Sequence, residues 1–574
     1  MDFLFIFAHM ELLNMKKILL MAALAACATM ACAKAPKGES IELKSAKKTV
    51  LNVTVDGRPL KVTWYVDNYV RYPNWPEDQL INIYIPENAT KASPILFHVN
   101  NSGWLSNPYP KNTVVEGRDY DGTNDKTGAA LREGFVVVSY GCRSRANAPV
   151  EGEYLGHSPA TMTDTKAAIR YLRHNRKSLP AGDTDRIIIT GTSGGGALST
   201  VIAASGNSPD YYPSLYEIGA AGVTRLKDGT YVSDPAFGDE VFAVIGYCPI
   251  TDLEHSCAGY EWLFGRTREV MYLTGEMKYS QADEKTILAG SKELAALYGP
   301  YVDGLGLKDE QGKSIDSGNL RYYIEKLMRE EIEKTLAEVG PEQMKKDIEA
   351  EIRQRGPGGR GGRAGGPGTD QARQAAAQTA AAAPVQHRVN NGWLTFNEDG
   401  SYNYDLEKHL YYVAKYTTLK VAPAFSNKGL YGGGGQNEDT LFGTPGQEYS
   451  PFNPYSWNHD KAQNGAGLDE TGLTWDEFMQ TEAGKDLMLQ AKMACAIDYL
   501  VEGKVDTAPY WYVRHGMDDR DNSFAVETTL FYAVKGNAKV RDANVGFAWL
   551  KPHSGDYDIP EAFAWLMDVL SRAE

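Results

Sequence analysis

The stretch from residue 186 to residue 206 constrains the fold of this chain more than any other. Its sequence, RIIITGTSGGGALSTVIAASG, runs from a β-branched apolar segment through a glycine-rich turn into a helical segment. Ser193 lies in the pattern G-x-S-x-G, which between a strand and a helix is typical of a nucleophilic serine on a strained turn. Gly191 and Gly195 let the strand and the helix pass closely. A phosphate-binding loop fits less well, because no Lys-Ser/Thr pair follows and the spacing is not G-x-G-x-x-G.

Short apolar runs alternate with helical segments in two separate parts of the chain. Residues 50–55 and 62–70 alternate apolar and polar side chains around Asp56 and Gly57, which predicts a β-hairpin. The further predicted strands cover residues 81–85, 94–99, 134–140, 187–190, 241–247, 508–513 and 545–550. An amphipathic helix is predicted over residues 164–174. The pattern predicts an α/β-hydrolase fold, a mostly parallel sheet flanked by helices.

The alternation stops between about residues 261 and 480. Long charged helices are predicted there instead, such as residues 319–354. Residues 356–383 are rich in Gly, Arg, Ala and Gln, cannot bury a core, and predict a disordered loop. We therefore expect a large helical lid inserted between the sixth and seventh strands. The predicted domains are an export segment (1–33), a first hydrolase part (34–260), a lid domain (261–480) and a second hydrolase part (481–574).

The first residues predict export from a bacterium. Translation from Met15 gives two lysines, then the apolar run ILLMAAL and small residues, which is the pattern of a signal peptide. Two endings remain open: a lipidation motif, LAAC, at residues 24–27, and an ordinary small-residue cleavage site at residues 31–33. A lipid anchor would sit on Cys27 or Cys32. The expected location is periplasmic, secreted or anchored at the cell surface.

Charge and cysteine usage exclude some classes of function. The net charge of −15 argues against a nucleic-acid partner, because phosphate binding needs a basic surface. The four cysteines beyond the export segment are scattered, and Cys248 and Cys257 could pair in an oxidising periplasm. Buried free thiols are the favoured reading. No metal site and no cofactor are predicted.

The groups that activate a serine nucleophile lie late in the chain. A serine hydroxyl needs a neutral imidazole within hydrogen-bond reach and a carboxylate that orients this imidazole. Asp519 follows the predicted strand 508–513 and His553 follows the last predicted strand, in the order that the fold requires. Asp518 competes with Asp519, and the H-G-x-x-D spacing favours Asp519.

Two backbone N–H groups are expected to bind the oxyanion of the reaction. One belongs to Gly194, at the start of the helix after Ser193. The other is expected from the loop HVNNSG after strand 94–99, where related folds often carry HGGG. Ser102 is the predicted donor, and an asparagine-rich turn without a role is the alternative.

Three motifs together resemble the bacterial tannases, the tannin acylhydrolases of the α/β-hydrolase superfamily. They are GTSGGGALS around Ser193, RHGMDDRDNSF around Asp519 and HSGDYD around His553. The resemblance covers most of the chain from about residue 50 onward, except for the Gly/Arg/Ala-rich insert. It implies hydrolysis of galloyl esters with Ser193, Asp519 and His553 as the catalytic triad.

The resemblance also implies residues that hold the galloyl hydroxyl groups. They are the second aspartate, Asp521, and two residues of the lid stretch LKVAPAFSNKGLYGGGGQNEDTLFG, Lys420 and Glu438. The run of four glycines looks like an insertion there, and Lys428 is the alternative to Lys420. Such a set suits a ring with three adjacent phenol groups, because carboxylates accept from phenols and an ammonium donates to the central oxygen. A surface ion pair between Lys420 and Glu438 is the alternative reading.

The sequence therefore predicts an exported serine esterase that acts on a small aromatic ester, with galloyl esters favoured. A feruloyl or acetyl esterase acting on plant polysaccharide would use the same triad with a different pocket. A prolyl peptidase is disfavoured, because no propeller repeats precede the hydrolase region. A non-catalytic surface protein that binds polyphenols or glycans is the alternative of another class.

Overall fold

The structure of the chain is a computed structural model. It describes residues 38–105, 109–110, 112–276, 284–354, 391–417, 419–426, 438–459 and 471–573. The predicted export segment with Cys27 and Cys32, the loop 356–383 and the alternative pocket residue Lys428 lie outside the described residues.

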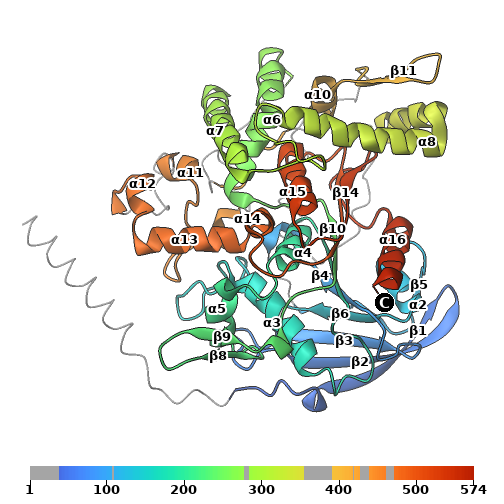
Figure 1. Cartoon of the computed structure of the whole chain (residues 1–574), viewed down its shortest axis with the longest axis vertical. Coiled ribbons are helices and arrows are strands. Elements are labelled where there is room, and N and C mark those ends of the chain that lie inside the picture. The colour runs from blue at the N-terminus through green and yellow to red at the C-terminus, as the bar shows by residue number, and fades with distance from the viewer. Residues whose placement is uncertain are drawn as a thin grey trace, which may run out of the picture. The chain divides into compact units, whose positions relative to one another are not determined.

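A ten-stranded sheet forms the centre of residues 40–573 (Figure 1). Its order is β14-β13-β10-β7-β4-β6-β3-β2-β1-β5. The strands are β1 (Lys47–Val55), β2 (Arg58–Asn68), β3 (Leu80–Pro86), β4 (Ile95–Val99), β5 (Asp119–Tyr120), β6 (Val136–Tyr140), β7 (Ile187–Thr192), β10 (Ala243–Tyr247), β13 (Tyr510–Gly516) and β14 (Asp542–Ala548). The predicted hairpin is confirmed: β1 and β2 are antiparallel and joined by Asp56 and Gly57, both with positive φ, as a tight hairpin turn requires.

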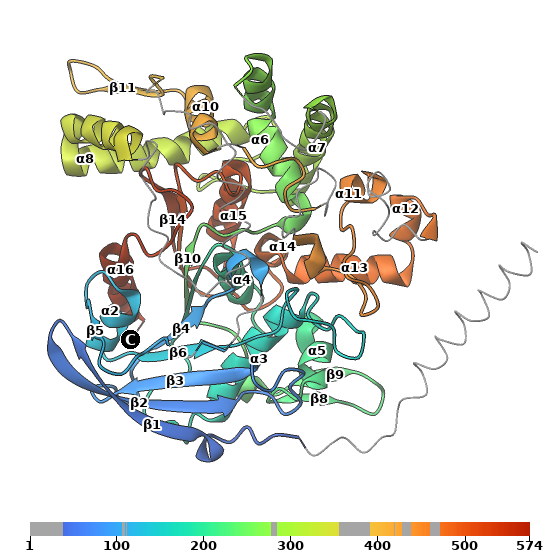
Figure 2. The same cartoon turned by 180° about the vertical axis from the view of Figure 1, so that it is seen from behind.

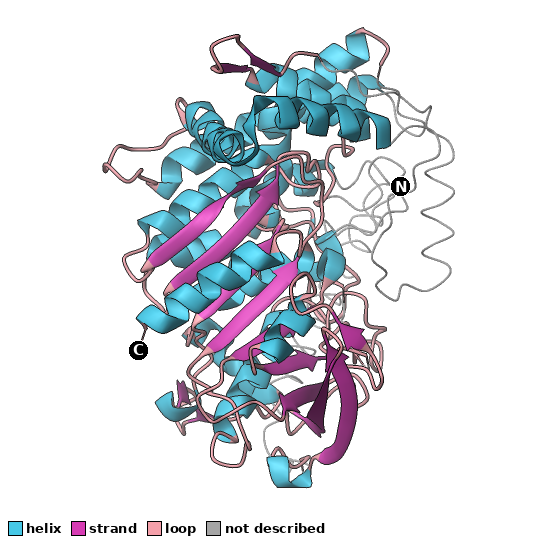
Figure 3. Cartoon of the chain, turned by 90° about the vertical axis from the view of Figure 1, so that its right-hand side faces the viewer, coloured by secondary structure: helices cyan, strands magenta, loops and turns pink. Residues whose placement is uncertain are grey.

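Six strands, from β14 to β6, are mutually parallel. Their residues are apolar in near-continuous runs because helices cover both faces of the sheet, as Figure 3 shows. Alternate side chains enter two separate cores. One core packs against α2 (Lys126–Arg132) and α16 (Ile559–Arg572), and the other against α3 (Ala160–His174), α4 (Gly194–Ala204) and α15 (Phe524–Gly536).

A large insertion separates β10 from β13, although these strands are neighbours in the sheet. Counted from β2 and without the two-residue β5, it lies between the sixth and seventh strands. Its helices and short strands are α6 (Leu253–Leu273), α7 (Glu284–Leu305), α8 (Leu320–Gln354), β11 (Leu394–Phe396), β12 (Tyr402–Tyr404), α10 (Leu406–Thr417), η5 (Glu438–Leu441), α11 (Pro454–His459), α12 (Trp475–Phe478), α13 (Glu482–Met493) and α14 (Ala496–Glu502). Four of the helices, α6, α7, α8 and α10, gather at one end of the sheet in both Figure 1 and Figure 2. The predicted fold class, an α/β-hydrolase fold with a helical insertion, is confirmed.

Two details of the insertion differ from the sequence prediction. The long helix expected over residues 319–354 is interrupted at Gly340, where φ is +76° and Pro341 follows. A proline lacks the N–H that an uninterrupted helix needs, so α8 bends at this point. A short hairpin of β11 and β12 also occurs in a region where no strand was expected.

Short elements outside the insertion complete the fold. They are η1 (Leu43–Ser45), η2 (Ser102–Trp104), η3 (Pro209–Tyr211), α5 (Tyr212–Glu217), β8 (Val223–Arg225), β9 (Tyr231–Ser233) and η4 (Pro235–Phe237). In the part of the chain that the structure describes, no helix has the length and apolar composition needed to cross a membrane. Cys142, Cys248, Cys257 and Cys495 are buried and form no disulfide within the described residues, so Cys248 and Cys257 do not pair.

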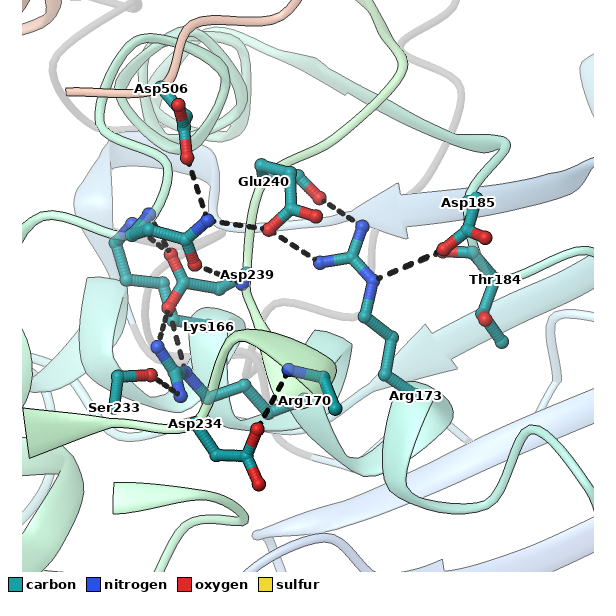
Figure 4. A network of polar contacts seen from close by, with 12 residues as sticks. Lys166, Arg170, Arg173, Thr184, Asp185, Ser233, Asp234, Asp239, Glu240 and Asp506 are labelled. Atoms are coloured by element: carbon teal, nitrogen blue, oxygen red, sulfur yellow. Dashed lines mark hydrogen bonds and ion pairs between the residues drawn. The ribbon is translucent and has the colours of Figure 1, made fainter. Parts of the chain in front are cut away.

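The polar side of α3 is buried, whereas an amphipathic helix predicts a solvated one. Lys166 and Arg170 both bind the carboxylate of Asp239, at 2.8 and 2.6 Å, with all three side chains at most 1% exposed (Figure 4). Asn207 donates to Asp506, just before β13, at 2.9 Å and to Glu240 at 2.7 Å. The charged residues on one side of α3 therefore do not mark a face in water. They pair with Asp239 inside the molecule.

Candidate active site

Ser193 lies on a sharp turn between β7 and α4. Its φ and ψ are +62° and −126°, a conformation that a non-glycine residue adopts only when its surroundings hold it there. Its N–H donates to the carbonyl of Tyr247 at 2.9 Å. A Cβ at Gly191 would lie 2.3 Å from the carbonyl oxygen of Gly195, and one at Gly195 would lie 2.8 Å from that of Val99. The glycines are therefore needed for the close passage of strand and helix that the sequence predicts.

The structure brings Ser193, His553 and Asp519 into one hydrogen-bonded chain. Nε2 of His553 lies 2.8 Å from Oγ of Ser193, and Nδ1 of the same ring lies 2.7 Å from Oδ2 of Asp519. Asp519 follows the carboxyl end of β13 and His553 follows that of β14. The serine and the histidine stand 360 residues apart in sequence. The arrangement has the geometry that a serine nucleophile, its imidazole base and an orienting carboxylate require.

The pKa shifts of Asp519 and His553 suit His553 to act as a base. Burial acts to raise the pKa of the Asp519 carboxyl, but His553, His515 and the hydrogen bonds to the carboxylate hold this pKa below its usual value. Burial acts to lower the pKa of His553, but the charge and hydrogen bond of Asp519 raise it above its usual value. Asp519 is thus a fixed anion that increases the basicity of the imidazole.

Asp518, the competing carboxylate, takes a different position. Its backbone N–H donates to the carbonyl of Lys551 at 3.0 Å, and its side chain is buried. The structure places Asp519, and not Asp518, against His553.

The loop 101–103 lies directly beside Gly194. A Cβ on Gly194 would lie 2.4 Å from the carbonyl oxygen of Asn101, 2.4 Å from the nitrogen of Trp104 and 3.0 Å from the nitrogen of Gly103. Gly194 begins α4, so its N–H has no partner within the helix. Ser102 begins η2 in this loop. The two predicted sources of oxyanion donors are therefore adjacent, close to Ser193.

The three predicted pocket residues interact electrostatically beside His553: the charges of Asp521 and Lys420 act on the pKa of His553, and the same two charges act on the pKa of Glu438. Oδ2 of Asp521 lies 3.9 Å from Nε2 of His553, and the Asp521 N–H donates to Asp519 at 2.7 Å. Glu438 is buried in η5; burial raises its pKa, while the charge of Lys420 acts to lower it. The ammonium of Lys420 lies 4.1 Å from the ring centroid of Phe425. Two carboxylates and one ammonium thus lie close enough to interact electrostatically next to Ser193, His553 and Asp519.

The alternative reading of Lys420 and Glu438 as a surface ion pair is wrong. Glu438 is only 7% exposed. Within the described residues its ion-pair partner is Arg145, whose Nη2 lies 3.8 Å from Oε1 of Glu438.

Three residues of the site were not found from the sequence. Arg145 bridges Glu438 and Gly103, as described below. Cys248, with φ of +44° at the end of β10, has its Sγ within 4.8 Å of ligand atoms of Asp519 and His553. Cys248, Asp519 and His553 together resemble a metal-ligand set, but the imidazole of His553 and the carboxylate of Asp519 are hydrogen-bonded to each other. Burial, with the charge of Asp519, also raises the pKa of the Cys248 thiol well above its usual value, which keeps it protonated.

His515 is the third of these residues and lies completely buried behind Asp519. Its Nδ1 is 3.6 Å from Oδ2 of Asp519 and 3.6 Å from Oε1 of Glu527. Burial lowers the pKa of His515 to about 4, so the ring is neutral at pH 7. The sequence places His515 four residues before Asp519, but no local pattern indicates that the fold turns it toward the carboxylate.

Comparisons with known proteins agree with this geometry. The BD-FAE family model, of an α/β-hydrolase type, matches residues 81–284. The tannase of Fusobacterium nucleatum is 27% identical, with 93% of this chain and 100% of that chain covered and a TM-score of 0.66. The tannin acyl hydrolase of Lactobacillus plantarum is 25% identical, covering 92% and 98% of the chains with a TM-score of 0.62. A tannin acyl hydrolase in complex with ethyl gallate is 25% identical, with 92% of this chain and 98% of that chain covered and a TM-score of 0.64. No curated protein matches the sequence. The resemblance to tannases predicted from the three motifs is confirmed.

Proposed function

We propose that this protein is a serine esterase that hydrolyses galloyl esters. The observation that carries the proposal is the hydrogen-bonded chain Ser193–His553–Asp519 beside a buried carboxylate, Glu438, and a second one, Asp521. The similarity to tannases, one of them in complex with ethyl gallate, supports a small aromatic ester as the substrate.

The proposed reaction passes through an acyl-enzyme. Oγ of Ser193 attacks the ester carbonyl carbon while Nε2 of His553 takes the hydroxyl proton, and Asp519 stabilises the imidazolium that forms. The N–H of Gly194 and one N–H of the loop 101–103, with Ser102 as the predicted donor, bind the oxyanion. The C–O bond to the alcohol then breaks as His553 protonates the leaving oxygen. A water molecule, deprotonated by His553, attacks the acyl-enzyme and releases the acid.

The proposed pocket distinguishes gallate from simpler acids through its hydroxyl groups. Carboxylates of Asp521 and Glu438 accept hydrogen bonds from phenol groups, and the ammonium of Lys420 donates to a phenol oxygen. A benzoate without hydroxyl groups would form no hydrogen bonds with these three side chains, which disfavours its binding relative to gallate. The insertion between β10 and β13 acts as the lid that carries Lys420 and Glu438.

Methyl gallate hydrolysis tests the proposal. The purified protein and its Ser193→Ala variant are assayed on methyl gallate, methyl ferulate and p-nitrophenyl acetate. We expect the highest kcat/KM on methyl gallate and a loss of about 10⁴-fold or more in Ser193→Ala. Activity on ferulate or acetate alone keeps the triad and contradicts the gallate pocket. Hydrolysis that Ser193→Ala leaves unchanged contradicts the mechanism, and binding without hydrolysis favours the non-catalytic alternative.

Export of the protein is part of the same proposal. The signal-peptide pattern after Met15 supports it, with either a lipid on Cys27 or Cys32 or a free secreted chain. Mass spectrometry of the mature N-terminus from the producing cells distinguishes these forms. An N-terminus at Met1 or Met15 in the mature protein contradicts export.

A further inference from the structure

Arg145 connects two parts of the candidate site that are far apart in sequence. It follows β6 in a segment without regular structure, and its side chain is only 4% exposed. Its guanidinium contacts both the loop of η2 and the helix η5 of the insertion. Thr440, its partner in η5, stands 295 residues away in the chain.

The contact with η2 fixes a backbone group next to the oxyanion loop. Nε–H and Nη2–H of Arg145 both donate to the carbonyl oxygen of Gly103, at 3.1 and 2.8 Å. The C=O of Gly103 shares a rigid peptide plane with the N–H of Trp104, which donates to Asn101 at 3.1 Å. Gly103 itself has a φ of +63° and lies against Gly194. The guanidinium therefore holds in place the turn that lies beside Gly194.

The contact with η5 fixes the proposed pocket carboxylate. Nη1–H of Arg145 donates to Oγ1 of Thr440 at 2.9 Å, and Nη2 lies 3.8 Å from Oε1 of Glu438. Burial raises the pKa of the Glu438 carboxyl, and the charge of Arg145 is the largest influence that acts against this rise. The same charged group thus supports Glu438 as an anion and determines where η5 lies.

We propose that Arg145 is a positioning residue that sets the preference for hydroxylated aromatic acids. It does so by holding Glu438 of the insertion and the loop 101–103 of the sheet domain at a fixed separation. The inference rests on the proposed function. The planar guanidinium makes both contacts at once, which the single ammonium of a lysine does not.

Two variants separate the two contacts. In Arg145→Met both are lost, so we expect kcat on p-nitrophenyl acetate to fall about 10-fold through the displaced loop. We also expect KM for methyl gallate to rise about 10-fold or more through the unsupported Glu438. Arg145→Lys retains the charge near Glu438 without the fork to Gly103, so it should restore most of the KM for methyl gallate but not the kcat.

Control variants distinguish the proposed positioning role of Arg145 from a general contribution to stability. Arg118→Met, at a half-exposed arginine paired with Asp125, should leave both constants unchanged. In a Glu438→Gln background, Arg145→Met should raise KM for methyl gallate no further, because the contact that it supports is already lost. Equal losses on all esters in both Arg145 variants, with additive effects in the double variant and lower melting temperatures, overturn the proposal. Unchanged constants in Arg145→Met overturn it as well.

The wild-type protein separates this inference from the proposed function. If it hydrolyses p-nitrophenyl acetate without a preference for methyl gallate over methyl benzoate, the proposed function fails, and the specificity role of Arg145 fails with it. If it prefers methyl gallate and Arg145→Met keeps that preference, only the inference about Arg145 is overturned.

Discussion

At the scale of single residues, the proposed mechanism makes Asp519 the group that sets the pH at which His553 can act as a base. The raised pKa of His553 means that the ring is protonated, and inactive as a base, until the pH passes above its usual value of 6.5. We therefore expect kcat/KM to decline as the pH is lowered, with the midpoint of this decline above pH 6.5. A pH–rate profile on p-nitrophenyl acetate, which has no ring hydroxyls to titrate, measures the midpoint.

The Asp519→Asn variant checks the cause of this shift. The amide cannot stabilise the imidazolium, so the midpoint should move to lower pH and kcat should fall about 10⁴-fold. The Asp518→Asn variant is the matched control, because the carboxylate that accepts from Nδ1 of His553 is that of Asp519; we expect its midpoint to stay with the wild type. A midpoint that moves in Asp518→Asn and stays in Asp519→Asn would reverse the assignment of the two aspartates.

Glu438 predicts a second, substrate-specific pH effect. Its pKa is raised by burial, so the carboxylate takes up a proton at a pH above the usual value of 4.5. We expect KM for methyl gallate to rise as the pH falls through this pKa, because the protonated carboxyl is a poorer acceptor for a phenol group. KM for methyl benzoate should stay flat over the same range. In Glu438→Gln the rise for methyl gallate should disappear; persistence of the rise would assign the effect to another group.

The site residues that could be predicted are those marked by a motif in the nearby sequence or by their place after a strand. The turn around Ser193 is recognisable because a β-branched strand, small residues and a helix follow one another directly. Asp519 and His553 could be found because the fold fixes their positions after the last two strands. Arg145 could not be found, since its role depends on Gly103 and on an η5 residue about 300 positions away, and no local pattern encodes such a contact.

At the scale of elements, the close approach of α4 to η2 depends on Gly194. A side chain there would overlap the carbonyl oxygen of Asn101 and the nitrogen of Trp104, each 2.4 Å from its Cβ. Gly194→Ala should therefore displace the loop and lower kcat on every ester by about 10²-fold, which is the effect of losing one oxyanion donor. Gly536→Ala, at the end of α15 with nothing within 4 Å of an added Cβ, is the control and should keep full activity. Full activity of Gly194→Ala would show that the loop does not contribute.

The periodicity of apolar residues predicted whether most segments are helices or strands, but not which of their polar faces are buried. The apolar runs of the parallel strands and the alternation in the first hairpin have direct physical causes, namely burial on both faces or on one. The charges of α3 have the same spacing whether they face water or Asp239, so the sequence alone did not show that Lys166 and Arg170 are buried. The bend of α8 at Gly340 follows from two residues whose effect a helical pattern conceals.

At the scale of the whole molecule, Asp239 is expected to be a major source of stability. It neutralises two buried cations of α3, and burial raises its pKa less than Lys166 and Arg170 lower it. Asp239→Asn leaves these cations without an anion and should lower the free energy of unfolding by about 3–5 kcal/mol. Urea unfolding at pH 7 measures the change. Asp185→Asn, at a carboxylate that is 69% exposed, is the control and should leave the unfolding midpoint in place.

The same carboxylate predicts how stability depends on pH. Because the pKa of Asp239 in the folded protein lies below its usual value of 3.8, its contribution is complete above that value and is lost as the pH falls below it. The wild type should therefore lose stability in acid more steeply than Asp239→Asn. Parallel curves for the two proteins would contradict this role.

The 360 residues between Ser193 and His553 have a consequence for synthesis of the protein. A ribosome completes the nucleophile and its strained turn early, whereas the proposed base arrives only with the final strand of the sheet. Every truncated product that ends before His553 therefore has the serine without the group that is proposed to activate it. Under the proposed mechanism, partial chains do not hydrolyse esters inside the cell that makes them, and activity begins only once translation has reached the last strand.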